Sequence, residues 1–291
     1  MLGTDVIDFD RLEAELADLR ASYATARPFP HIVIDDVLRP EALAEVYAEF
    51  DVVDDDTWRK YLHVNERKYA NTDPTTWGPT TRQVADGFAS DRFLRFLGEL
   101  TGFEDLLADT AYDGGGLHRS LRGGYLNVHA DFTAHHVEQH WRRRVNLLLY
   151  LNPVWDPAWG GDLELWSKDM EQCERTVAPV GNRMLLFTTD EDAYHGHPDP
   201  LSCPPGVARQ SLALYYFTED PAPLIRSTDY RARPGDGVKS AAIYADKQLL
   251  HLYDVLKRRL RLSDDIASKG LVLADRVRRL GRRGSDTPDD P

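Results

Sequence analysis

Residues 145–151 read Val145-Asn146-Leu147-Leu148-Leu149-Tyr150-Leu151, a short apolar run that ends at Asn152-Pro153. A run of this length next to turn residues is typical of a buried β-strand. Similar runs lie at 122–129, 162–166, 183–188 and 210–217, separated by turns such as Gly123-Gly124, Trp159-Gly160-Gly161 and Gly181-Asn182. Because no long helical pattern comes between these runs, the middle of the chain predicts a sandwich or barrel and not a parallel α/β sheet.

Helical patterns flank this β-rich region. Leu12, Leu16 and Leu19 have helical spacing and predict a helix over 8–22. Further helices are expected from Pro40 to about Phe50, over 84–100 and from 240 onward, and the β-branched run 31–34 predicts a strand. Residues 58–80 show little periodicity, so we expect a long loop of the kind that is often functional or mobile.

The order of these elements divides the chain into three parts. We expect residues 1–110 to form a helical or mixed segment that packs on the core, and 111–222 to form the β core. Residues 223–291 would then form a linker, helices and a polar tail. The predicted fold class is mainly β with flanking helices (α+β).

The composition narrows the class of partner. The 291 residues include 35 Lys and Arg against 48 Asp and Glu, a formal net charge of −13. Because nucleic-acid binding needs clustered positive charge, nucleic acid is not expected as a main partner. There is no membrane-helix run and no signal-peptide pattern, and Cys173 and Cys203 are too few for a disulfide scaffold. We therefore expect a soluble, cytoplasmic protein without a membrane partner.

The motif that carries chemistry is Asn127-Val128-His129-Ala130-Asp131. Residues two apart on a strand share a face, so His129 and Asp131 would present an imidazole and a carboxylate side by side. On its own this pair is equally typical of a buried His–Asp hydrogen bond. A third ligand is available in His195, with His197 as a competitor for that role. Two imidazoles and one carboxylate on one face of a metal are the arrangement of non-haem Fe(II) oxygenases.

Arg209 and Ser211 add a second signal on the run 210–217. If this run is a strand, the two side chains share a face. An arginine there would clamp a carboxylate through two parallel hydrogen bonds, and the hydroxyl would add another. The alternative for Arg209 is a surface ion pair, which is common in an acidic chain.

The region from Gly123 to Phe217 resembles the catalytic core of the prolyl-4-hydroxylase-like 2-oxoglutarate- and Fe(II)-dependent oxygenases. The matching pieces are His129-Ala130-Asp131, Arg143-Arg144-Val145-Asn146-Leu147-Leu148-Leu149-Tyr150-Leu151-Asn152, Gly160-Gly161-Asp162-Leu163, His195-Gly196 and Arg209-Gln210-Ser211. The lead-in from Arg27 to Asp35 is also similar to bacterial members, which extends the resemblance over about 27–220. It implies a double-stranded β-helix core, a jelly roll of cupin-like architecture.

Carried over to this sequence, the resemblance implies a complete catalytic site. His129, Asp131 and His195 would be the catalytic residues that hold Fe(II), and dioxygen and 2-oxoglutarate would be co-substrates, with ascorbate as a candidate reductant. Cofactor-binding residues would be Arg209, which pairs with the distal carboxylate of 2-oxoglutarate, and Ser211, which assists it. Tyr125 and Tyr150 are expected to line the 2-oxoglutarate pocket. Collagen-type members have a lysine near the place of Arg209, which weakens a prolyl assignment. They often have a threonine at the place of Asn146, so the resemblance implies side-chain help from Asn146 to the co-substrate.

The expected reaction is hydroxylation of an unactivated C–H bond, with succinate and CO2 as co-products. Asp131 favours hydroxylation, because halogenases of this superfamily have a small residue at that place. We expect a small metabolite or an amino-acid-like compound as substrate, with a prolyl side chain in a peptide or protein as the alternative. The rival classes are a cupin-like metal-binding protein without oxygenase activity and a zinc hydrolase. His135, His136 and His140 are expected on a rim near the pocket and not at a second metal.

Overall fold

The computed structural model describes residues 6–246 and residue 248 of the chain. The helices that precede β4 (Leu107–Ala108) are α1 (Phe9–Ala14), α2 (Leu16–Thr25), α3 (Pro40–Asp51), α4 (Pro79–Ala89) and α5 (Asp91–Thr101), with the short 3-10 helices η1 (Asp55–Thr57) and η2 (Pro74–Thr76). A third 3-10 turn, η3 (Pro157–Trp159), lies later in the chain, between two strands.

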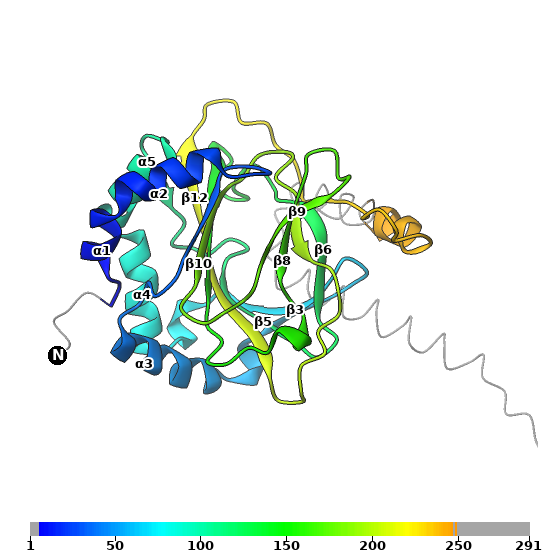
Figure 1. Ribbon diagram of the computed structural model, residues 1–291, viewed down its shortest axis with the longest axis horizontal. Coiled ribbons are helices and arrows are strands. Elements are labelled where there is room, and N and C mark those ends of the chain that lie inside the picture. Colours follow the sequence, from blue (N-terminus) through cyan, green and yellow to red (C-terminus); the bar gives the residue numbers. More distant parts are fainter. Residues whose placement is uncertain (1–5, 247, 249–291) are drawn as a thin grey trace, which may run out of the picture.

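The strands form one 13-stranded sheet that curls into a barrel-like jelly roll (Figure 1). The strands are β1 (His31–Ile34), β2 (Arg59–Leu62), β3 (Glu66–Asn71), β4 (Leu107–Ala108), β5 (Gly116–Leu121), β6 (Tyr125–Ala130), β7 (Trp141–Tyr150), β8 (Leu163–Trp166), β9 (Cys173–Val177), β10 (Met184–Thr188), β11 (His195–His197), β12 (Ala208–Glu219) and β13 (Asp229–Tyr230).

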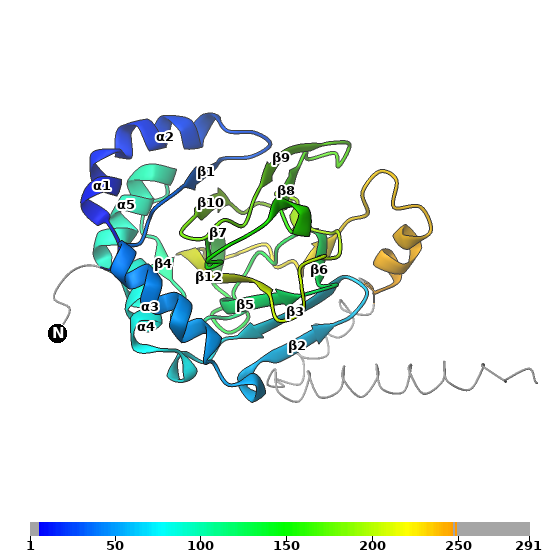
Figure 2. The same ribbon diagram turned by 60° about the horizontal axis from the view of Figure 1, so that its bottom comes forward.

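The order along the sheet is β1-β10-β7-β12-β5-β3-β6-β11-β8-β9, with β2, β4 and β13 added at its sides. All the pairs are antiparallel. Strand β3 pairs with β5 along one part of its length and with β6 along another, so it joins the two halves of the barrel. Figure 2 shows β2 and β3 at one side of the barrel and helices α1 to α5 at the other.

The helices cover the outer face of the half formed by β1, β10, β7 and β12 (Figures 1 and 2). Leu147 and Leu149 of β7 pack in the same apolar cluster as the buried side chains of α3, α4 and α5. Leu212, Leu214 and Tyr216 of β12 do the same. Because side chains alternate along a strand, the intervening residues point into the barrel.

The strand-rich middle of the chain is confirmed, and the runs expected at 31–34, 145–151, 162–166, 183–188 and 210–217 are strands within one to four residues. The helix expected from Pro40 is α3. The single helix expected over 8–22 is two helices in the structure, α1 and α2. The helix expected over 84–100 is also divided, between α4 and α5, because Ser90 caps α5. The side chain of Ser90 accepts from the backbone N–H of Phe93, and this bond starts a new helix.

The expectation of a long loop over 58–80 is wrong. This segment contains the hairpin β2–β3 and the first residues of α4. Its strands are rich in charged residues and do not alternate clearly, so no local pattern indicates them. They form because β3 finds its partners far along the chain, in β5 and β6.

Strands β1, β2 and β3 of the expected N-terminal segment belong to the same sheet as the core, and β13 of the expected C-terminal segment pairs with β6. The three-part division of the chain stays a prediction. Residues 239–246 are helical, as expected from 240 onward, but the spacing from Leu249 to Leu260 lies outside the described residues. Within the described part of the chain, no helix is long and apolar enough to cross a bilayer.

Candidate active site

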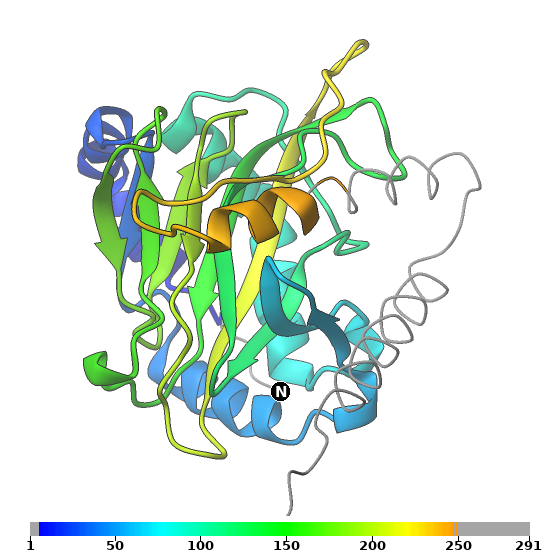
Figure 3. The same cartoon turned by 90° about the vertical axis from the view of Figure 1, so that its right-hand side faces the viewer.

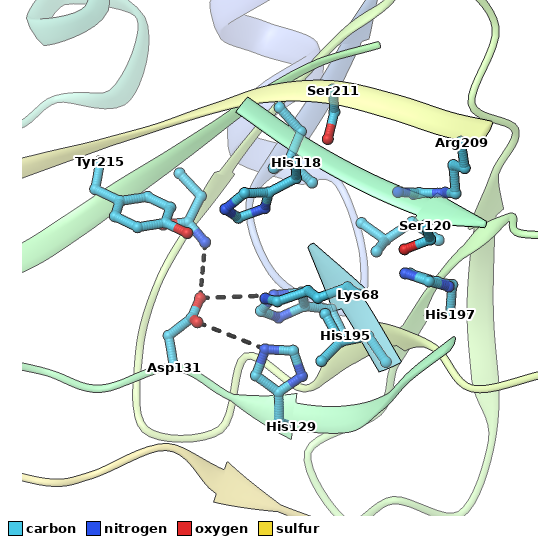
Figure 4. Close-up of a pocket in the computed structure, with 14 residues that line it drawn as sticks. Lys68, His118, Ser120, His129, Asp131, His195, His197, Arg209, Ser211 and Tyr215 are labelled. Carbon is cyan, nitrogen blue, oxygen red and sulfur yellow. Dashed lines mark hydrogen bonds and ion pairs between the residues drawn. The ribbon is translucent and has the colours of Figure 1, made fainter. Parts of the chain in front are cut away.

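His129, Asp131 and His195 converge inside the barrel (Figure 4). His129 lies on β6, Asp131 follows the end of that strand, and His195 opens β11, where it pairs directly with His129. The Nε2 atom of His129 is 3.6 Å from Oδ1 of Asp131, and the Nε2 atom of His195 is 3.5 Å from Oδ2. One ligand atom from each residue lies within 4.8 Å of the other two.

Backbone carbonyls fix how the two imidazoles are presented. The Nδ1 atom of His129 lies 2.9 Å from the carbonyl oxygen of Asn127, and that of His195 lies 2.9 Å from the carbonyl oxygen of Ala193. A carbonyl can only accept, so Nδ1 donates in both rings. In a neutral imidazole the lone pair is then on Nε2, the atom that faces Asp131. Burial lowers the pKa of His195 to about 4, which favours its neutral form.

Asp131 is held in its ionised form by its neighbours. The amide of Asn146 donates to Oδ2 of Asp131 at 2.7 Å, and Nη2 of Arg143 lies 3.2 Å from the same oxygen. Burial by itself would raise the pKa of Asp131, but the charge of Arg143 opposes burial and holds this pKa well below its usual value. Arg143 is itself buried, and its guanidinium stacks 3.5 Å from the ring centroid of Tyr215.

These three side chains fit a divalent cation. Two imidazole lone pairs and a carboxylate oxygen repel one another at 3.5–3.6 Å, and a cation between them turns that repulsion into attraction. The Nδ1–H···O=C bonds are the second-sphere support usual for metal-binding histidines. Two histidines and one carboxylate are the donor set of non-haem Fe(II) sites, which keep coordination positions open.

Arg209 lies in the same cavity, on β12. Its Nε donates to the carbonyl of Gly161 at 2.7 Å, and its Nη2 donates to the hydroxyl of Tyr150 at 3.4 Å. No carboxylate of the described residues forms an ion pair with this buried guanidinium, and burial lowers the pKa of Arg209. A buried cation without a counter-ion is costly, so this site favours an anionic ligand.

Gly161 explains how the loop before β8 reaches Arg209. Its φ is +83°, a conformation that side chains disfavour. A Cβ atom there would also lie 2.6 Å from Leu201 and 3.2 Å from Arg209. The pair Gly160-Gly161 therefore allows a backbone carbonyl to orient the guanidinium.

The cavity has a volume of about 70 Å³, which exceeds the space of a single water. Figure 4 shows Arg209 and His197 at one side of it and Asp131 at the other. Its lining includes Lys68, His118, Ser120, Leu126, His129, Asp131, Asn146, Leu148, Leu163, His195, His197, Arg209, Ser211 and Tyr215.

Sequence reasoning missed Lys68 and His118, because β3 and β5 had no recognisable pattern. Asn146 lines the cavity, and its amide donates to Oδ2 of Asp131. His118 Nε2 and His197 Nδ1 are buried ring nitrogens with no hydrogen-bond partner among the described residues. His197 shares the cavity with the triad without belonging to it.

The remaining expected residues are distributed as follows. Ser211 lines the cavity, and Tyr150 is buried behind it, against Arg209. Tyr125 is not part of the lining, because its hydroxyl donates to the carbonyls of His63 and Val64 on the other side of β6.

The cluster of His135, His136 and His140 also lies away from the cavity lining. His136 binds Asp113 at 2.6 Å, and Nε2 of His135 lies 3.5 Å from Asp109. His140 is half exposed to solvent. None of the three belongs to the group of potential metal ligands found among the described residues.

Comparisons with known proteins agree with this geometry. Residues 115–217 match the family model of the 2OG-Fe(II) oxygenase superfamily. A prolyl-4-hydroxylase from Pseudomonas putida has a similar structure, with a TM-score of 0.51 and 20% identity over 71% of this chain and 100% of that one.

A prolyl hydroxylase from Trichoplax adhaerens, solved with a peptide fragment of hypoxia inducible factor, gives a TM-score of 0.52 and 15% identity over 71% and 92% of the two chains. At these identities the structures show the fold, a double-stranded β-helix. No curated protein sequence matches the chain. The segment that matches the 2OG-Fe(II) oxygenase superfamily, a family that uses Fe(II) and 2-oxoglutarate, contains every member of the triad.

Proposed function

We propose that this enzyme hydroxylates an unactivated C–H bond of a small or amino-acid-like substrate. His129, Asp131 and His195 hold the Fe(II) in this proposal, and Arg209 with Ser211 binds the distal carboxylate of 2-oxoglutarate. The observation that carries the proposal is the placement of three metal-type ligand atoms and one uncompensated guanidinium in a single buried cavity.

The metal, when bound, supplies the oxidative chemistry that couples 2-oxoglutarate decarboxylation to substrate oxidation. The protein residues position the reactants. The hydrogen bonds at Nδ1 leave a lone pair on Nε2 of both His129 and His195. Arg143 and Asn146 keep Asp131 ionised and oriented. Walls of Leu126, Leu148 and Leu163 keep part of the cavity apolar.

Arg209 offers the group that recognises a dicarboxylic acid. Nε is already oriented by Gly161, which leaves the outer edge of the guanidinium for a carboxylate. Ser211 and Ser120 line the same part of the cavity and can donate hydroxyl hydrogen bonds. Tyr150 supports Arg209 from behind and adds a cation–π contact at 5.0 Å.

Calorimetric titration of 2-oxoglutarate into protein loaded with Zn(II) tests the binding part of this proposal without turnover. We expect one 2-oxoglutarate per chain, with binding that depends on the metal. A cupin-like protein without oxygenase activity would show no such binding. Succinate release with Fe(II) and dioxygen tests the reaction, and a zinc hydrolase would instead retain activity without dioxygen.

The substrate class is tested by screening for stimulated succinate release. Small amino-acid-like acids should stimulate it more than proline-containing peptides do. Stronger stimulation by peptides, with hydroxyproline as the product, would favour the alternative of a peptidyl prolyl hydroxylase.

A further inference from the structure

Lys68 places a second positive charge in the cavity, on a different strand from Arg209. Lys68 lies on β3 and Arg209 on β12, with β5 between these two strands in the sheet. Nζ of Lys68 is 3.0 Å from Oε2 of Glu66, its one ion-pair partner among the described residues. An ammonium has three N–H donors, so two of them remain for a ligand.

Glu66 binds a second basic side chain besides Lys68, the imidazole of His63. Oε1 of Glu66 is 2.9 Å from Nε2 of His63, whose Nδ1 is 2.8 Å from Oδ2 of Asp246. Burial opposes the protonated form of His63, but Asp246 and Glu66 outweigh burial and raise its pKa to about 9. Two carboxylates, Glu66 and Asp246, are therefore shared between two positive charges, Lys68 and protonated His63.

The charge of Lys68 also acts on His118, an imidazole outside the triad that lines the same cavity. Burial and then the charge of Lys68 lower the pKa of His118 to about 3, and the opposing effect of Glu66 is smaller. Lys68 thus acts as a positive charge inside the cavity, despite its ion pair with Glu66.

The hairpin that carries Lys68 is fixed in place from outside the barrel. Figure 3 shows the helix of residues 239–246 beside β2 and β3. Asp246 of this helix accepts from Nδ2 of Asn65 at 2.8 Å as well as binding His63. A network of buried polar groups therefore holds the turn between β2 and β3, which ends three residues before Lys68.

We propose that Lys68 binds a carboxylate of the organic substrate, so that the substrate is a small organic acid. This inference rests on the proposed function, in which Arg209 takes the distal carboxylate of 2-oxoglutarate and the metal takes its other end. Lys68 is then the cation that remains for the second reactant. Its place in the lining beside the triad puts the bound acid within the same cavity as the metal.

The test uses protein loaded with Zn(II) and saturated with 2-oxoglutarate, so that no turnover occurs. The probes are N-acetylated amino acids and their primary amides, which differ within each pair by one negative charge. We expect at least one acid to bind about tenfold or more tightly than its amide, as for a charge-assisted hydrogen bond. Lys68→Met should remove this preference, and Lys68→Arg should retain it.

Lys60→Met is the matched control, because Lys60 lies exposed on β2 of the same hairpin. It removes the same charge outside the cavity and should leave the preference unchanged. Lys68→Gln is a second neutral variant that keeps a hydrogen-bond donor for Glu66, and it serves if Lys68→Met does not fold. Retained 2-oxoglutarate affinity shows that a variant is folded.

Three results would overturn the inference: equal binding of acids and amides, binding of neither class, or a tenfold loss of 2-oxoglutarate affinity in Lys68→Met. The last result would assign the ammonium to the co-substrate. Failure of the proposed function is distinguishable, because the unsubstituted Zn(II) protein would then not bind 2-oxoglutarate at all.

Discussion

Arg143 and Asn146 point to the same side of β7 although they are three residues apart. The Nε of Arg143 donates to Oδ1 of Asn146 at 2.8 Å, and both groups reach Oδ2 of Asp131. Side chains three apart on a regular strand face opposite ways. The pairing of β7 with β12 shifts at this point. Tyr216 pairs with Val145, but the next residue, Phe217, pairs with Arg143. Arg144 is therefore an extra residue in the ladder. This bulge brings both supports to the carboxylate.

Substitution of Arg143 is expected to weaken metal binding. Arg143→Met removes the charge that orients and ionises Asp131, and losing such a support typically costs about 10- to 100-fold in metal affinity. Titration with Mn(II) or Zn(II) measures this. Arg142→Met is the control, since Arg142 points outward to Asp190 and Asp220. Equal affinities for the two variants would show that Arg143 does not support the metal.

Loss of a triad residue should have a larger effect. His129→Ala or Asp131→Ala is expected to lower Fe(II)-dependent succinate release by more than about a hundredfold, beyond the effect of losing a supporting residue. The control is His140→Ala, at a half-exposed histidine away from the cavity. Turnover that survives in either triad variant would refute the ligand assignment.

Arg209→Met should weaken 2-oxoglutarate binding by about 2–5 kcal/mol, the range for losing one partner of a buried charge pair. Calorimetry on the Zn(II)-loaded protein measures the change. Arg226→Met, at an exposed arginine paired with Glu191, removes the same charge from the surface. An unchanged affinity in Arg209→Met would remove this residue from the proposed co-substrate site.

The sequence predicts those parts of the site that follow strand alternation or a family motif. His129 and Asp131 are two residues apart, as are Arg209 and Ser211, and the sequence predicts a common face for each pair. All four line the cavity, although Asp131 lies just after the end of β6. Arg143 with Asn146 depends on a bulge, which leaves no local pattern in the sequence.

Lys68 and His118 could not be predicted for a related reason. Each enters the cavity through pairing between β3, β5 and β6, which are distant along the chain. Tyr125, expected to line the 2-oxoglutarate pocket, is absent from the cavity lining, and its hydroxyl donates to the carbonyls of His63 and Val64. Long-range pairing and bulges decide which side chains meet, and neither is a property of a short window of sequence.

The ion pairs of His63 should make stability depend on pH. Burial opposes its charged form, but Asp246 and Glu66 raise its pKa in the folded protein to about 9, above the ordinary value of 6.5. A raised folded pKa stabilises the protein fully below pH 6.5, and this contribution is lost as the pH rises through 9. The linked loss is up to about 3 kcal/mol in the free energy of unfolding.

Urea denaturation of the full chain at pH 6 and pH 9.5 measures this difference. His63→Gln cannot titrate, so its unfolding free energy should change less between the two pH values than that of the unsubstituted protein. Asp246→Asn should give an intermediate dependence, because it removes one of the two carboxylates that bind His63 and leaves Glu66. If the unsubstituted protein and His63→Gln lose the same stability across this range, His63 is not charged in the folded state.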